Sequence, residues 1–247
     1  MIVRRLLACV LITACAVTAQ AFRFEPISQD FAPSGPGATH VFRVFNSGTE
    51  QIAVRVTVRP RTIERDGTEE QGPESDRFLV YPRQMLLAPD EGRSVRIRWQ
   101  GPDTVESELS FRVIAEQLPV DFGGTRPAEG AGIRLTYRYE GSLYVVPPGA
   151  ASELLISRAE VVERDGRQLL HMVIENRGTR RSLIHQPRVT VAATRGVSTA
   201  LVLESDALSG MAGENMLAAS VREFIVPAPP GLSNGQVDAR LEYTSRH

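Results

Sequence analysis

Short segments in which apolar and polar residues alternate restrict the fold of this chain more than any other feature. In the segment from Gln51 to Val58, the apolar residues Ile52, Val54, Val56 and Val58 fall on one face of an extended chain. Comparable segments recur about every 8–12 residues and are separated by turn residues, while helical periodicity is hard to find. The pattern predicts an all-β protein built from β-sandwiches.

A proline-rich break divides the pattern into two parts. The break is Val146-Pro147-Pro148-Gly149, which is typical of a short, stiff linker. On either side of it a strand candidate ends in a similar turn, Asn46-Ser47-Gly48 in the first half and Asn176-Arg177-Gly178 in the second. We therefore expect two related β-sandwich domains in tandem, over residues 22–147 and 148–247.

The N-terminus has the features of an export signal. Arg4 and Arg5 precede an apolar run from Leu6 to Ala19, and Ala19-Gln20-Ala21 resembles a signal-peptidase site. The run is shorter than a typical membrane span, so no membrane insertion is expected. We predict a signal peptide over residues 1–21. The alternative is a lipoprotein signal cleaved before Cys15, and both alternatives export the protein.

Composition excludes several classes of chemistry. Cys9 and Cys15 both lie in the predicted signal, so cleavage after Ala21 leaves no cysteine for a disulfide or a thiolate. All 28 basic residues are arginine, which excludes enzymes that need a lysine Schiff base and phosphate-binding loops that end in Gly-Lys-Ser/Thr. A net charge of −1 gives no bulk attraction to nucleic acid.

Catalytic and metal-binding motifs are not found. His40, His171, His185 and His247 are not at metal-ligand spacing from one another or from a cysteine. No nucleophile, base and orienting group can be placed together, and no nucleophile elbow or dinucleotide-binding motif occurs. The sequence therefore predicts no metal, no cofactor and no enzymatic activity.

Two small clusters of charged residues are interpreted as solvated. Glu106 and Glu108 lie two residues apart, which places them on one face of a strand. Buried carboxylates are rare, so we expect both at an exposed edge. Arg177, Arg180 and Arg181 have no interleaved aromatic residues, and we expect them in a solvated loop.

One alternating segment follows a long glycine-rich loop. Residues Ile133 to Tyr139 alternate strictly after a loop from Gly123 to Gly132, a pattern that favours an edge strand. An apolar edge strand needs a partner, because an unpaired one invites aggregation, and donating a strand to another polypeptide is a known mode of recognition. The alternative is an ordinary inner-sheet strand of the sandwich.

Three segments resemble a known family. The sequence from Tyr81 to Ile97, followed by Glu108 to Pro119, resembles the N-terminal domain of periplasmic pilus-assembly chaperones of the chaperone–usher pathway. The strand Phe42-Arg43-Val44-Phe45-Asn46 is also similar to a family strand that ends in Asn. The resemblance extends from about Phe24 through Pro147, and the second half is similar only in length and β pattern.

The resemblance implies a periplasmic, non-enzymatic chaperone with two immunoglobulin-like domains set in an L. Such a chaperone lends an edge strand to an incomplete pilus subunit and passes the subunit to an outer-membrane usher. The residues at the donor positions are Ile133, Leu135 and Tyr137, and Arg96 and Glu108 match a structural charged pair. Self-association is left open, because a client-free copy can pair its exposed strand with another copy.

The chain departs from the family where the subunit carboxylate is usually anchored by two basic residues. The first position matches Ser28 or Gln29 and the second matches Ser142, and none of these is basic. A charge-assisted clamp cannot form from these side chains.

Other arginines are candidate substitutes for the missing clamp. An arginine expected near the end of the donor strand is replaced by Val146, and the candidate substitutes are Arg138, Arg23 and Arg112. We expect each of these three to be an exposed arginine on a sheet surface, because isolated surface charges are common, and a role in the clamp is the alternative. The departures leave a second hypothesis, a structural or adhesive immunoglobulin-like protein without a pilus client.

Overall fold

The structure is a computed structural model that describes residues 22–120, 122, 135–193 and 200–246. The expected signal peptide, over residues 1–21, and the expected donor residue Ile133 lie outside the described residues. Among the described residues, no helix is long and apolar enough to cross a membrane.

The first half of the chain forms the elements β1 (Arg23–Glu25), β2 (Ser28–Phe31), η1 (Pro36–Ala38), β3 (Thr39–Phe45), β4 (Ile52–Ile63), β5 (Glu69–Gln71), β6 (Phe78–Tyr81), β7 (Gln84–Leu87), β8 (Gly92–Trp99), β9 (Leu109–Leu118) and β10 (Arg138–Val145). The second half forms β11 (Leu154–Arg164), β12 (Arg167–Asn176), β13 (Ser182–Ala193), β14 (Leu201–Glu204), η2 (Ser205–Leu208), β15 (Asn215–Met216), β16 (Val221–Pro227) and β17 (Gly235–Arg246).

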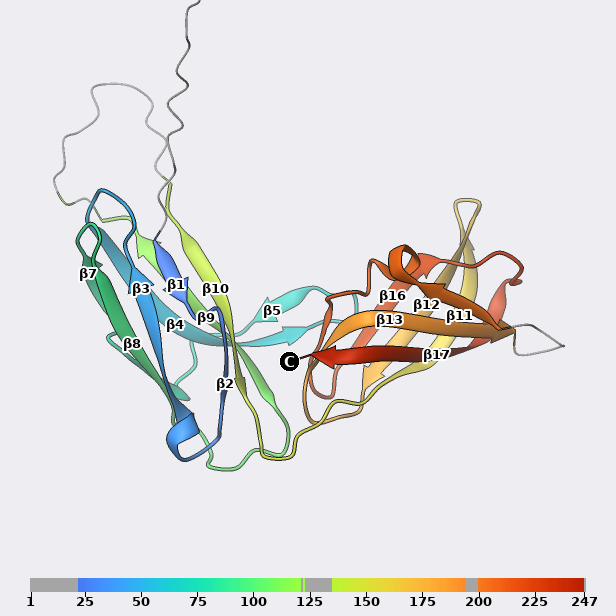
Figure 1. Ribbon diagram of the computed structural model, residues 1–247, viewed down its shortest axis with the longest axis horizontal. Helices are drawn as coiled ribbons and strands as arrows, with labels where there is room; N and C mark the ends of the chain where they lie inside the picture. Colours follow the sequence, from blue (N-terminus) through green and yellow to red (C-terminus); the bar gives the residue numbers. More distant parts are fainter. Residues whose placement is uncertain (1–21, 121, 123–134, 194–199, 247) are drawn as a thin grey trace, which may run out of the picture.

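The first domain is a sandwich of two sheets (Figure 1). Over the described residues, one sheet has the order β1-β3-β8-β6, and the other has the order β2-β10-β9-β4-β5 with β7 also paired to β4. Every pairing is antiparallel except that of β2 with β10, which is parallel. The N-terminal strand therefore contributes to both sheets.

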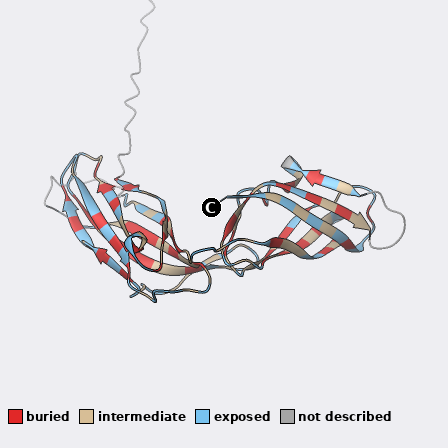
Figure 2. Cartoon of the chain, turned by 60° about the horizontal axis from the view of Figure 1, so that its bottom comes forward, coloured by how far each residue is buried: buried red, intermediate tan, exposed pale blue. Residues whose placement is uncertain are grey.

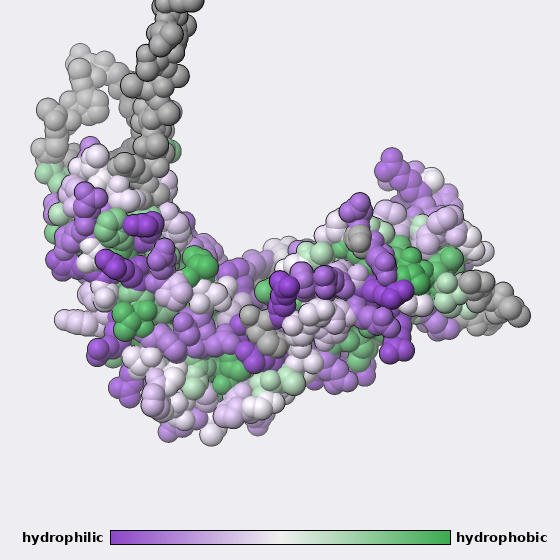
Figure 3. All heavy atoms as spheres, viewed as in Figure 1, coloured by the Kyte–Doolittle hydropathy of each residue, from purple (hydrophilic) through white to green (hydrophobic). Residues whose placement is uncertain are grey.

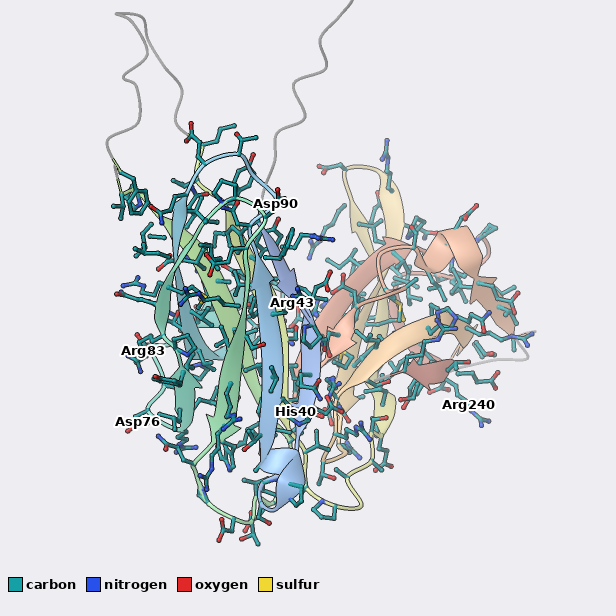
Figure 4. The ribbon with its side chains drawn as sticks, turned by 60° about the vertical axis from the view of Figure 1, so that its left-hand side comes forward. His40, Arg43, Asp76, Arg83, Asp90 and Arg240 are labelled. Atoms are coloured by element: carbon teal, nitrogen blue, oxygen red, sulfur yellow. The ribbon has the colours of Figure 1, made fainter. Side chains whose placement is uncertain are left out.

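Alternate side chains of each strand fill the space between these two sheets, as Figure 2 shows by the alternation of buried and exposed colours. The ring of Phe78 lies at the centre of an aromatic group, with edge-on contacts to Trp99 at 5.1 Å, Phe111 at 5.0 Å and Phe31 at 5.4 Å between centroids. Each fully buried side chain of this size contributes about 1.5–3 kcal/mol. The His40 ring, labelled in Figure 4, packs edge-on against Phe31, and its Nε2 lies 3.0 Å from the carbonyl oxygen of Gly37 in η1.

The second domain has a separate core, which includes the buried side chains of Leu170, Met172 and Ile174 on β12. Its described strands run in the order β14-β13-β17-β11-β12-β16, with β15 also paired to β13. Strand β17 joins two layers, because its first residues pair with β11 and the rest of the strand pairs with β13.

The same asparagine corner occurs in both domains. Asn46 donates from Nδ2 to the carbonyls of Glu50, Leu87 and Ala88 at 2.8–3.1 Å, and its Oδ1 accepts from Gly48 N at 2.9 Å. The equivalent Asn176 donates to three carbonyls at 2.8–3.1 Å and accepts from the amide two residues ahead at 3.0 Å; its partners are Arg180, Met216, Leu217 and Gly178. The repeated turn seen in the sequence is therefore a repeated hydrogen-bonded structure.

The two domains lie at an angle, and the β4–β5 hairpin extends from the first domain towards the second (Figure 1). The predicted fold class, an all-β protein of two tandem sandwiches in an L, is confirmed. On the face shown in Figure 3, hydrophobic residues lie in separate patches among hydrophilic ones.

Candidate functional site

The N-terminal segment that forms β1 and β2 changes sheets beside the middle of β10, at Gly141 and Ser142. Residues Arg23–Glu25 pair with β3 in one sheet, and residues Ser28–Phe31 pair with β10 in the other. The change occurs at Pro26 and Ile27, and the Ile27 carbonyl accepts a hydrogen bond from Ser142 N at 2.8 Å. The residues of β10 that precede Ser142 are therefore not covered by β2.

Gly141 permits this crossing. A Cβ atom at Gly141 would lie 2.7 Å from the Ile27 carbonyl oxygen and 2.8 Å from Cγ1 of Val113. Both distances are shorter than side chains tolerate, so any other residue would push the β2 entrance away from β10. The glycine is required by a close backbone approach and not by an unusual φ.

The edge of β10 is open before Gly141. The Tyr137 carbonyl accepts from Gln117 N of β9, so the backbone groups of odd-numbered residues face β9. The backbone groups of Arg138 and Glu140 face the opposite side, where no described strand pairs with them. These groups can form a ladder with an added strand.

The predicted donor residues occupy different environments. Leu135 precedes β10 and its side chain is 63% exposed. Tyr137, also before the regular strand, is half-buried and packs against the first domain's own core. The strand expected over residues 133–139 is therefore described as a strand only from Arg138 onwards. The donor assignment of Leu135 and Tyr137 stays a prediction.

The two positions that lack the usual basic residues lie on adjacent strands. Ser142 pairs with Ser28, and Gln29 pairs with the next residue of β10, Leu143. Ser142 Oγ accepts a hydrogen bond from Arg112 Nη1 at 2.8 Å.

Of the three suggested substitutes, the structure brings Arg112 to this position. Arg138 forms an ion pair with Glu140 at 2.8 Å. Arg23 lies on β1 in the other sheet, 4.7 Å above the Phe45 ring. Arg43, on the neighbouring strand β3 (Figure 4), also lies near this ring, at 6.0 Å.

Arg112 also holds a carboxylate. Its Nε donates to Glu69 Oε1 at 2.7 Å and its Nη2 donates to Oε2 at 2.5 Å, while Arg61 Nη1 donates to Oε2 at 3.0 Å. Partial burial raises the pKa of Glu69, but the hydrogen bonds and charge of Arg112, with smaller contributions from Gln71 and Arg61, bring that pKa down to about 2. The carboxylate is therefore ionised at neutral pH.

A buried charged cluster joins the two domains. Glu108 accepts from Arg181 Nη1 at 2.7 Å and lies 4.0 Å from Arg180 Nε, while Asp30 on β2 pairs with Arg181 at 2.7 Å and with Arg180 at 2.9 Å. The Arg181 guanidinium also lies 3.4 Å from the centre of the Tyr144 ring. Burial raises the pKa of Glu108, and Arg181 offsets only part of this effect.

This cluster corrects three sequence interpretations. Glu108 does not pair with Arg96, because Arg96 is exposed on β8 in the other sheet and has no ion-pair partner in the described part of the chain. Glu108 is buried and not solvated. Arg180 and Arg181 lie in a loop between β12 and β13, as expected, but they form ion pairs across the domain boundary and are not freely solvated. The sequence could not show this, because their partners lie far away along the chain.

A pocket of about 650 Å³ lies between the domains. Residues 60–63, 73–77 and 108–111 of the first domain and 217–220 of the second line it. Nearby, Asn215 Nδ2 donates to the Tyr144 hydroxyl at 3.0 Å across the domain boundary. Within the described ranges, no three His, Cys, Asp or Glu side chains gather in a way that could hold a metal ion.

Comparison with known proteins places the fold. No family model matches the sequence, and no curated protein matches it. Among solved structures, it is similar to the class 5 fimbriae chaperone CfaA, with 16% identity, a TM-score of 0.56 and coverage of 91% of this chain and 100% of that one.

Two solved complexes contain similar chains. One is a chaperone–tip adhesin complex of CFA/I fimbriae biogenesis, with 16% identity, a TM-score of 0.57 and coverage of 90% and 98% of the two chains. The other is the CsuC–CsuE chaperone–tip adhesion subunit complex of Acinetobacter baumannii Csu pili, with 14% identity, a TM-score of 0.57 and coverage of 89% and 97%. The chain has the two-domain fold of the fimbrial chaperones.

Proposed function

We propose that the protein is a periplasmic chaperone that stabilises pilus or fimbrial subunits by donating the open edge of β10 and passes them to an outer-membrane usher. The observation that carries the proposal is the unpaired backbone of Arg138 and Glu140, next to the exposed side chain of Leu135. The shared fold with chaperones solved in complex with a tip adhesin supports it.

The physical mechanism is strand addition. A client strand placed beside β10 would bond the free N–H and C=O groups of the edge, and apolar side chains before β10 would cover the client's exposed core. Burying the expected donor side chains of Ile133 and Leu135 would contribute about 1.5–3 kcal/mol each before ordering costs. The third expected donor side chain, Tyr137, would contribute less, because it is already half-buried against its own domain. The reaction needs no covalent step and no cofactor.

The first experiment is a pull-down of the tagged mature protein from its native periplasm, with the bound proteins identified by mass spectrometry. The wild type is compared with Leu135→Arg, because a charge at this exposed position would enter the client's apolar groove. We expect a small β-rich subunit with the wild type and none with the variant, at equal thermal stability.

Two results would contradict the proposal. If neither protein retains a subunit while the variant is equally folded, the structural or adhesive alternative is favoured. If Leu135→Arg lowers thermal stability in parallel with binding, then Leu135 is a core residue and not a donor residue.

Periplasmic fractionation of the native protein tests the export that the N-terminal sequence predicts.

A further inference from the structure

The carboxylate of Glu69 accepts hydrogen bonds from Arg112, the arginine that lies beside Ser142. Its carboxylate receives three hydrogen bonds from Arg112 and Arg61 and one from Gln71 Nε2 at 3.2 Å. Arg61 is buried, and its Nε has no hydrogen-bond partner among the described residues. Without the Glu69 carboxylate, the guanidinium groups of Arg112 and Arg61 would lose their anionic ligand.

A third arginine and a second carboxylate lie on this face, where Gln71 Nε2 donates to Glu69 and, at 2.8 Å, to Glu140. Arg59 on β4 pairs directly with Arg112 on β9, and Arg59 is half-buried without an ion-pair partner in the described ranges. Like charges directly opposite each other on neighbouring strands are destabilising. An anion that replaced Glu69 would keep Arg112 and Arg61 paired, and it would also lie near Arg59.

The path of an added strand ends at this face. A strand on the open edge can pair with β10 only up to Glu140, because β2 occupies the edge from Ser142 onwards. A strand parallel to β10, as β2 is, would bring its C-terminal end to this point. Its terminal carboxylate would then lie close to Ser142 and its hydrogen-bond partner Arg112.

The element that carries Glu69 has few backbone pairs. Strand β5 has three residues, and they pair only with Arg61–Ile63 at the end of β4. A two-stranded ribbon of this kind is marginally stable by itself. The hairpin also contacts the second domain, where Glu223 N donates to the Arg65 carbonyl at 2.7 Å.

We propose that the Glu69 carboxylate is a built-in competitor, which occupies Arg112 and Arg61 until the carboxylate at the end of a bound client strand displaces it. This inference rests on the strand-donating function proposed above. Displacement exchanges one carboxylate for another and frees the β4–β5 hairpin, so that client binding alters a contact between the two domains.

The test uses a seven-residue peptide of alternating valine and threonine, labelled at its N-terminus, with either a free C-terminal acid or an amide. Fluorescence anisotropy gives its affinity for the mature wild type, for Glu69→Gln and for the matched control Glu70→Gln, whose altered residue is the exposed neighbour on β5. We expect Glu69→Gln to bind the acid form about tenfold more tightly than the control does, because a competing charge-assisted contact is removed. The amide form should bind all three equally.

Each other outcome has a distinct meaning. If Glu69→Gln binds the acid form no more tightly than the control Glu70→Gln does, the competitor role is overturned. If the amide form still binds in that case, strand donation stands. Failure of both peptides to bind any protein would overturn the proposed function and this inference with it. Arg112→Gln should remove the preference for the acid form, and retention of that preference would place the carboxylate elsewhere. Thermal melting of every variant identifies any that is unfolded.

Discussion

Arg181 of the second domain and Glu108 of the first form a buried ion pair across the domain boundary, with 2.7 Å between Nη1 and Oε2 and side-chain exposures of 4% and 0%. Removal of one member of a buried pair leaves the other charge without compensation. The pair is joined by Asp30 and by the ring of Tyr144, so it fixes the orientation of β2 and β10 relative to the second domain.

We therefore predict that Arg181→Met lowers the free energy of unfolding by about 3 kcal/mol, because Glu108 remains buried without its partner. The double variant with Glu108→Gln should recover most of this loss. Urea unfolding measures the stability, and small-angle X-ray scattering measures the angle between the domains. An equal loss in the single and double variants would show that the pair is not coupled.

Gly141→Ala should destabilise the first domain by about 1–3 kcal/mol, because the added Cβ would overlap the Ile27 carbonyl and Val113. The matched control is Gly210→Ala, where a Cβ would meet no atom within 4 Å. Thermal unfolding of both variants measures the difference. Similar melting temperatures would show that β2 can move away from β10 without cost.

The stability of the protein should depend on pH through Glu69. Its pKa is lowered from 4.5 to about 2, so its contribution is fully present above pH 4.5 and is lost as the pH falls towards 2. After allowance for solvent screening, the contribution is about 1–2 kcal/mol. Denaturant unfolding at pH 7, 4.5 and 3 should show the wild type losing its advantage over Glu69→Gln. A constant difference would contradict the lowered pKa.

The two described donor candidates should respond differently to truncation. Leu135→Ala should change stability by less than about 0.5 kcal/mol, because Leu135 is exposed. Tyr137→Ala should cost about 1–3 kcal/mol, because Tyr137 packs against the core. Thermal melting of the client-free protein measures both, and equal effects would place the two side chains in similar surroundings.

Client-free protein should self-associate weakly through the open edge of β10. Arg138→Pro should reduce the association, since proline removes an N–H that faces the open side and leaves the bonds to β9 in place. Sedimentation velocity over a range of concentrations measures the association. Dimers that persist in the variant would use another surface.

The alternation of apolar residues was sufficient to predict the sandwich fold and the strand over Gln51–Val58, which corresponds to the start of β4, because side-chain burial follows the period of the strand. The turn residues identified the corners at Asn46 and Asn176. The charged cluster could not be predicted, because Glu108 and Arg181 meet only when the domains dock. The contact between Glu69 and Arg112 could not be predicted either, because Glu69 lies on a hairpin that projects beyond the sheet.

The division of the N-terminal strand between two sheets has a consequence for how the domain would respond to a bound strand. A displacement of β10 would act on β2 directly and on β1 through the two residues between them, and β1 belongs to the opposite sheet. Amide protons of β1 and β2 should therefore become more protected from hydrogen exchange together when a client binds, although only β2 touches the donating strand.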